Sequence, residues 1–481
     1  MMYEMKVRLR TLRCSLALLA ALISVTTLPA RAQTNSTTPP TNVPGWLTEP
    51  LSLIDALNLT LKQNSTIIKA QADLESQRGL VIQTRAVALP TVAATGNATR
   101  SDPGLIEGFP FFSATTNSSG KTNITKTVSS RDSWSTAITL TQTIYQGGRT
   151  LSALRAAQLV KDQAMLNFQS TVADTLLAAR IAYYDVLVAE QQIIVNEAST
   201  NLLAKQFEDQ QRRYDAGTVP KFNVLQAEVA LDNAIPPVIN AYNTYRINKN
   251  NLCVLLGFNL PRDVWEDIPL NLTDKLDSNP YNIELPMAIA EALQKRTELQ
   301  ALQKEVGLQR ESIINAKAGY KPTISAFASW DWRSPEFSPD SQNQWNGWQI
   351  GGQFSWDIFD GMLTRGKVIQ AKAGLEHARA DVEDRARQIE LEVRTDYSSF
   401  INAREVLQSQ LKVEEEATEA LRLANARADA GTGTQLDVLN AQTQLTQART
   451  TEVQSLHDYD VARARLRRAI GEELTAPADS K

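Results

Sequence analysis

Residues 213–231 read RYDAGTVPKFNVLQAEVAL, and residues 427–445 read RADAGTGTQLDVLNAQTQL. Nine of these 19 positions are identical, at a constant offset of 214 residues. The same offset pairs Trp134 with Trp348, Gly147 with Gly361 and Tyr183 with Tyr397. One long unit is therefore used twice in the chain, and its period is far longer than that of a solenoid repeat.

The first 32 residues have the pattern of an export signal. A basic head with Lys6 and Arg8 precedes an apolar run from Leu16 to Leu28, and Ala30-Arg31-Ala32 follows. A basic head, a short apolar core and a small-x-small cleavage site are typical of a secretory signal peptide. We expect residues 1–32 to be removed and the mature protein to be exported.

The composition argues against nucleic-acid binding and enzyme chemistry. The formal charge is −4, and the leader holds five basic residues and one acidic residue, so the mature chain carries −8. An acidic exported chain is a poor nucleic-acid binder. His377 and His457 lie in charged helical stretches and are expected on solvated faces, and Cys253 is expected to pack as a small apolar residue. We find no phosphate loop, nucleophile motif or metal cluster, and expect no enzyme activity, cofactor or metal.

Each repeat is predicted to begin with one helix and to end with two. The opening helices run from Ser52 to about Leu89 and from Pro286 to about Lys321, and Ser52 forms a capping pair with Asp55. Proline-free stretches at about 150–215 and 364–429 predict long helices, each about 100 Å in length.

Return helices follow the turns at Gly217 and Gly431, the residue type that favours a left-handed helix cap. Pro236-Pro237 lies inside the first return helix, where we expect a kink or a break. The two shorter helices of each repeat together match the long one, so each repeat is predicted to form two parallel rods with a β-hairpin at one end.

Four segments alternate apolar and polar residues and are predicted to be strands: about 90–101, 133–145, 322–334 and 345–359. They are as long as a tilted membrane-spanning strand. Six of the eight tryptophans lie in or beside them, as in the aromatic belt at a membrane boundary: Trp134, Trp330, Trp332, Trp345, Trp348 and Trp356.

The expected organisation follows from these elements. A flexible segment at 33–50 precedes the first repeat at 51–257, a linker at 258–284 wraps the rods, the second repeat covers 285–471, and 472–481 is a tail. A polar loop at 103–132 joins the first strand pair.

Four strands cannot close a membrane barrel, since the smallest have eight and an open edge in lipid leaves backbone groups unsatisfied. The strands of separate chains must therefore combine. Two chains would supply 8 strands and three would supply 12, and only the larger barrel leaves a lumen. With the helices continuing beneath it, the sequence predicts a water-filled duct.

The duplicated Asp-Ala-Gly-Thr turn, Gly147-Gly148-Arg149 after the second strand, and Pro90 and Pro322 before the first and third strands resemble the TolC-like outer membrane efflux protein family. The resemblance covers about residues 51–471. It implies a mainly α protein with a membrane β-barrel: a homotrimer with a shared 12-stranded barrel in the outer-membrane lipid and a periplasmic helical tunnel. It also implies a tripartite efflux pump, with a periplasmic adaptor and an inner-membrane transporter as partners.

The resemblance further implies that the turns after the long helices form the periplasmic tip, which is the closed gate and the docking point of the adaptor. The tip residues are Asp215, Gly217, Thr218, Asp429, Gly431 and Thr432. The pore-facing positions are Asp437 and Asn440, with Asn223 and Gln226 as first-copy equivalents. Three copies of Asp437 would form a carboxylate ring that favours cations. Alternatively, Thr434 and Asp437 form a capping box and serve only the start of the last helix.

Two other functions stay open beside efflux. The chain could be the outer-membrane component of a type I protein secretion system. It could instead be a structural coiled-coil stalk or adhesin anchored by its hairpins, although a stalk would need neither duplicated glycine turns nor polar lumen faces.

Overall fold

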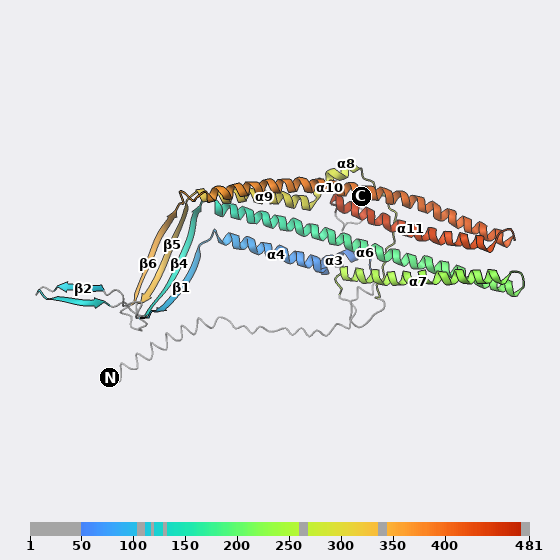
Figure 1. Cartoon of the computed structure of the whole chain (residues 1–481), viewed down its shortest axis with the longest axis horizontal. Coiled ribbons are helices and arrows are strands. Elements are labelled where there is room, and N and C mark those ends of the chain that lie inside the picture. Colours follow the sequence, from blue (N-terminus) through green and yellow to red (C-terminus); the bar gives the residue numbers. More distant parts are fainter. Residues whose placement is uncertain are drawn as a thin grey trace, which may run out of the picture. The chain divides into compact units, whose positions relative to one another are not determined.

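A computed structural model describes residues 50–102, 111–116, 120–127, 132–258, 268–334 and 344–472 (Figure 1). The expected leader, most of the segment at 33–50, the second strand-connecting loop at 335–343 and the tail from 473 lie outside these ranges.

The first repeat contains six main elements. They are α3 (Leu53–Gln63), α4 (Ser65–Ala86), β1 (Thr91–Arg100), β4 (Asp132–Gln146), α6 (Arg149–Asp215) and α7 (Lys221–Leu255). The second repeat has the same order: α8 (Leu285–Lys295), α9 (Thr297–Lys317), the short 3-10 helix η1 (Ala318–Tyr320), β5 (Thr323–Ser334), β6 (Trp345–Ser355), α10 (Leu363–Asp429) and α11 (Gln435–Ile470). The predicted fold class, mainly α with a duplicated helix–strand–strand–helix–helix unit, is confirmed.

In each repeat the shorter helices flank the long one. α4 and α7 pack against α6, and α9 and α11 pack against α10. α9 and α11 also contact α6, so the two repeats lie side by side, with the four long strands at one end of the helices (Figure 1). The predicted pairs of rods with strands at one end are therefore present.

The opening helix of each repeat is broken in two, which the sequence analysis missed. In the first repeat the break falls at Asn64, whose side-chain oxygen accepts from the backbone N–H of Thr66 at 2.8 Å and so caps α4. In the second repeat it falls at Arg296, which is extended (φ −62°, ψ 118°) between α8 and α9. Neither residue is a proline or glycine, and the apolar pattern continues across both breaks. The local sequence therefore gives no sign of them.

The two breaks have the same purpose. Asn64 donates from its side-chain amide to the carbonyl of Leu255 at 2.7 Å, and Arg296 donates to the carbonyl of Ala469 at 3.2 Å. Leu255 and Ala469 are equivalent under the offset of 214 and lie near the ends of the return helices. Each break therefore satisfies a terminal helix carbonyl that has no intrahelical partner.

The expected interruption at Pro236-Pro237 is wrong as a break, because α7 continues from Lys221 to Leu255 with both prolines inside it. Two prolines remove the backbone donors for the carbonyls of Asp232 and Asn233. All four residues are exposed, so water can replace the lost donors.

The four long strands form one antiparallel sheet in the order β1-β4-β5-β6. Ile138 lies opposite both Ala94 and Trp330, and Trp330 lies opposite Trp348, so the apolar positions of neighbouring strands share one face. Within the described strands, β1 and β6 each have a neighbour on one side only.

The segment expected to be a loop at 103–132 also contains structure. β2 (Phe111–Thr116) and β3 (Thr122–Thr127) pair with each other in a separate antiparallel hairpin. Both strands are rich in Phe, Thr and Ile, residue types that favour strands, a signal hidden by the Ser, Asn and Gly residues around them.

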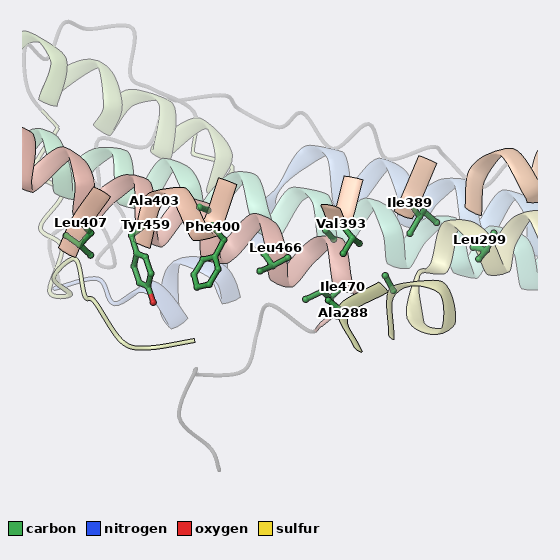
Figure 2. Close-up of a cluster of buried hydrophobic side chains, with 13 residues drawn as sticks. Ala288, Leu299, Ile389, Val393, Phe400, Ala403, Leu407, Tyr459, Leu466 and Ile470 are labelled. Atoms are coloured by element: carbon green, nitrogen blue, oxygen red, sulfur yellow. The ribbon is translucent and has the colours of Figure 1, made fainter. Parts of the chain in front are cut away.

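A buried cluster holds α8, α10 and α11 together. Figure 2 shows Phe400 near Tyr459, with Leu466 and Val393 further along the same contact. The rings of Phe400 and Tyr459 have centroids 5.5 Å apart. Each fully buried large side chain contributes about 1.5–3 kcal/mol to folding.

The inter-repeat linker is attached to these helices. The hydroxyl of Tyr459 donates to the carbonyl of Asn279 at 2.7 Å, and Arg463 donates to Asp277 at 2.9 Å. On the first repeat, the hydroxyl of Tyr183 donates to the carbonyl of Leu51 at 2.9 Å. Tyr183 is fully buried, so this hydrogen bond holds the start of the first repeat against α6.

Candidate functional site

The two tip turns have the same backbone geometry. The N–H of Gly217 donates to the carbonyl of Tyr214 at 2.8 Å, and the N–H of Thr218 donates to that of Arg213 at 2.9 Å. Gly431 and Thr432 repeat this pattern. It is a Schellman cap, which requires a left-handed residue, and Gly217 and Gly431 have φ of 73° and 72°.

Two side-chain contacts join the first tip to the second. Arg213 lies 3.4 Å from Asp429 and also pairs with Asp209 at 2.7 Å. Gln210 donates to Gln435 at 3.1 Å. The ion pair is exposed and worth at most about 1 kcal/mol, so the tips are held together weakly. Asp215 does not take part, because it accepts from Gln211 of its own helix at 2.9 Å.

Asp437 is engaged within its own turn. Its carboxylate accepts from the backbone N–H and the hydroxyl of Thr434 at 2.9 and 2.7 Å, and Thr434 caps the helix in return. These hydrogen bonds hold the pKa of Asp437 below its usual range. The expected capping box is therefore present.

The other three predicted pore-facing residues are not part of that box. Asn440 is exposed one turn further along α11, and Asn223 and Gln226 are half-buried in the first turns of α7. Pro220 precedes α7 and supplies no side-chain cap to it. Only the second tip therefore carries a carboxylate at this position.

The seam between the two repeats is polar, a feature that the sequence analysis missed. Ser199 lies 2.9 Å from Thr446, and Gln192 donates to Gln454 at 3.3 Å. Four buried amide atoms nearby have no hydrogen-bond partner among the described residues, those of Gln206, Gln210, Gln435 and Gln442. The second repeat also has an apolar cluster of Leu421, Val438 and Leu445, against which Leu202 of α6 packs from the first repeat. The sequence signal is the spacing by seven of Gln192, Ser199 and Gln206, which marks one face of α6 without identifying what packs against it.

His457 also joins the repeats, and the expectation that it lies on a solvated face is wrong. Its Nε2 lies 2.8 Å from Asp185 on α6, and its Nδ1 lies 3.1 Å from Asp458. Ionised carboxylates only accept, so this geometry suits a doubly protonated ring. Burial acts to lower the pKa of His457, but the hydrogen bonds to both carboxylates outweigh it and the pKa is raised. His377, in contrast, is exposed as expected.

The tryptophans expected to form an aromatic belt divide between the faces of the sheet. Trp330 lies opposite Trp348, and its ring centroid is 6.0 Å from that of Trp332. Trp134 and Trp332 lie on the same face of the sheet as Trp330 and Trp348. Trp345 lies opposite Arg333, on the other face. Trp356 follows β6 and donates to the carbonyl of Tyr320 at 3.2 Å.

The part of the chain that the structure describes holds no group of three or more His, Cys, Asp and Glu residues able to bind a metal. None of its helices combines the length and the apolar content needed to cross a membrane. Cys253 is fully buried on α7, as expected for a small packing residue, and burial raises the pKa of its thiol to about 11.

Comparison with known proteins identifies the family. The outer membrane efflux protein family matches residues 56–258 and 288–472. The outer membrane protein TolC of Vibrio cholerae is 24% identical over 344 residues, 71% of this chain and 77% of its own length. The alkaline protease secretion protein AprF of Pseudomonas aeruginosa is 25% identical over 425 residues, 87% of this chain and 84% of its own length.

Solved structures agree on the fold. The CmeC outer membrane channel of Campylobacter jejuni superposes with a TM-score of 0.73 at 15% identity, covering 87% of this chain and 85% of that one. VceC of Vibrio cholerae gives 0.69 at 18% identity, covering 87% and 96%. The family match spans both repeats and leaves out only the linker and the two ends. The chain therefore belongs to the outer membrane efflux protein family.

Proposed function

We propose that this protein is the outer-membrane exit duct of a tripartite efflux pump, with its strands in the membrane and its long helices in the periplasm. The observation that carries the proposal is the pair of 67-residue helices, α6 and α10, with a four-stranded sheet at one end and glycine-capped turns at the other. A sheet with two open edges cannot stand alone in lipid.

We infer that the working form is a homotrimer. Three sheets of four strands supply the 12 that a barrel with a lumen needs. The helices support the same assembly, because α9 packs between α6 and α10, whereas α4, its first-repeat equivalent, leaves Ile68 and Ile82 exposed beside α6. By the equivalence of the repeats, α10 of a second copy would cover α4 as α6 of the same chain covers α9.

The gate is proposed to lie at the tip turns. The ion pair between Arg213 and Asp429 is weak and the seam behind it is polar. The helix pair α6–α7 can therefore separate from α10–α11 at low cost. Phe222 and Leu436, exposed just beyond the turns, are available to a periplasmic adaptor. Asp437 would line the constriction while still capping its helix.

Type I protein secretion is the second candidate, and the alignment with AprF, a secretion protein by name, favours it specifically. Efflux and secretion use the same duct and differ in the partners. Affinity purification of the tagged protein from cross-linked cells, followed by identification of the inner-membrane partner, separates the two: a proton-driven pump supports efflux, and an ATP-driven exporter with a protein substrate supports secretion.

Planar bilayers test the proposed function itself. The purified protein is expected to insert into the bilayer and to give discrete, long-lived steps of current. The conductance of each step should be low because the tip is closed. A structural stalk would insert without conducting, and bilayers that stay silent at all protein concentrations would contradict the proposal.

A further inference from the structure

The strands β5 and β6 bring charged and aromatic side chains together at the end of the sheet away from the helices. β5 follows α9 and η1, and β6 leads into α10, so the end of β5 and the start of β6 lie at this far end (Figure 1). There Arg333 lies opposite Trp345, and Asp331 lies opposite Gly347. Because side chains alternate along a strand, these four residues lie on the face opposite to that of Trp330. In the proposed duct the apolar face contacts lipid, and this polar face lines the lumen.

A cavity of about 450 Å³ lies among these residues. Small-molecule sites have volumes of about 300–1,000 Å³. Gly347 keeps the cavity open, because a Cβ added there would meet nothing within 4 Å. Trp345 is 63% exposed and supplies a flat apolar wall, and Gln349 lines the cavity beside it. We call the cavity bounded by Asp331, Arg333, Trp345, Gly347 and Gln349 the exit cup.

Two opposite charges stand next to each other in the exit cup. Asp331 and Arg333 are two residues apart on one strand, about 7 Å. One carboxylate oxygen of Asp331 accepts from the hydroxyl of Ser329 at 2.7 Å, which orients the carboxylate. Among the described residues no ion pair joins Asp331 to Arg333, so both groups can pair with a ligand.

The ligand that complements this arrangement carries charges of both signs. A guanidinium binds a carboxylate through two parallel hydrogen bonds, and a carboxylate accepts from an ammonium group. The indole face of Trp345 favours a flat apolar body beside the two charges. A neutral sugar would also stack on the indole, but it would leave both charges of the cup without a counter-charge.

We propose that the exit cup binds a small zwitterionic molecule with an aromatic ring, one per chain. The carboxylate of the ligand pairs with Arg333, its ammonium group pairs with Asp331, and its ring lies against Trp345. This deepens the proposed function, on which the place of the cup in the lumen rests, by naming the chemistry of a cargo held at the mouth of the duct. Because the ion pairs are exposed, we expect a dissociation constant on the order of 1 mM.

Equilibrium dialysis of the purified full-length protein in lipid nanodiscs tests the proposal with four probes. Phenylalanine has the ring and both charges, and each of the others lacks one of them. The carboxylate is missing from 2-phenylethylamine, the ammonium group from 3-phenylpropionate, and the ring from alanine. We expect one phenylalanine per chain and about fivefold weaker binding of each other probe, which corresponds to the loss of one exposed contact. Glucose should not displace phenylalanine.

Substitutions in the cup assign each charge. Asp331→Asn should bind 3-phenylpropionate as well as phenylalanine, because the ammonium group no longer has a charged partner. Arg333→Gln should likewise bind 2-phenylethylamine as well as phenylalanine. Gly347→Val should abolish binding, because its side chain fills open space without a clash. Arg100→Gln is the matched control, since Arg100 lies at the same end of the sheet but on the other face, and it should bind as the wild type does.

Two results would overturn the exit cup. One is equal binding of phenylalanine and the three other probes, or displacement of phenylalanine by glucose. The other is unchanged binding of all probes in Asp331→Asn and Arg333→Gln. Planar bilayers test the duct separately: conductance without selective binding overturns the cup and leaves the duct standing, whereas selective binding without conductance supports the cup and overturns the proposed function.

Discussion

At the scale of single residues, Asp437 has two roles that one substitution separates. Asp437→Asn keeps an acceptor for Thr434 but removes the charge. We predict that cation preference in planar bilayers falls toward none while the trimer stays folded, because the substitution removes the proposed ring of carboxylates. Asp55→Asn, which changes the carboxylate paired with Ser52 far from the tip, is the control for the capping role. A lowered melting temperature with unchanged selectivity would leave Asp437 as a cap only.

The contacts of His457 with Asp185 and Asp458 should make the packing between the repeats depend on pH. The pKa of His457 is raised in the folded protein, so its stabilisation is fully present below the unfolded pKa of about 6.5 and is lost as pH rises through the folded value. We predict that His457→Gln costs about 1–2 kcal/mol near pH 5.5, and less above pH 8 or so. Thermal melting across pH measures this, with the exposed His377→Gln as the control. Equal losses of stability in His457→Gln at both pH values would show that the protonated ring does not stabilise the contact between the repeats.

Arg296 is the residue on which the second break depends. Buried at 3% exposure, it pairs with Glu298 and Glu392 and holds the carbonyl of Ala469. Arg296→Met leaves these groups without it, and we predict a loss of about 3 kcal/mol, the lower end for a buried pair because Arg468 still contacts Glu298. Arg310→Met, at an exposed position of α9, should be nearly neutral in the same denaturation experiment.

This loss should itself depend on pH. Burial acts to raise the pKa of Glu298, but Arg468 and Arg296 outweigh it and lower the pKa to about 2. A lowered pKa gives stability that is present above the unfolded value and lost as pH falls. The difference between wild type and Arg296→Met should therefore narrow between about pH 4.5 and pH 2; a constant difference would mean that Glu298 does not take part.

At the scale of elements, the return helices end where a glycine contacts the break in the opening helix. Gly257 has a φ of 82°, and a Cβ there would lie 2.4 Å from the carbonyl oxygen of Gln63. Gly217 has nearly the same φ with open space around it. Gly217→Ala should lower the stability by about 1–2 kcal/mol, the strain of a left-handed backbone. Gly257→Ala should lower it clearly more, because its Cβ would also contact the carbonyl of Gln63. Similar melting temperatures for the two variants would show that the contact relaxes freely.

The sequence predicted elements where the pattern is local and missed them where a distant contact decides. The repeat offset, the long helices and the alternation of the strands are local. The break at Asn64 depends on the carbonyl of Leu255, and the burial of His457 depends on Asp185, 272 residues away. The prediction of a break at Pro236-Pro237 was wrong although the signal was local. The helix is exposed there and tolerates the loss of two backbone donors.

At the scale of the whole molecule, the candidate site is only partly inferable from the chain. The duplicated glycine turns located both tips, and the capping box at Asp437 was evident from its spacing. The polar seam between the repeats was not, because heptad spacing identifies a helix face without identifying what lies against it. Which residues line a pore depends, in turn, on copies of the chain that one sequence does not place.

The central claim is that three copies combine their four-stranded sheets into one duct. The most direct test is the native mass of the protein extracted from outer membranes in mild detergent. The account predicts a single species with the mass of three mature chains, unchanged on dilution. A stable monomer or dimer in that extract would contradict it, because four strands leave both edges open and eight leave no lumen.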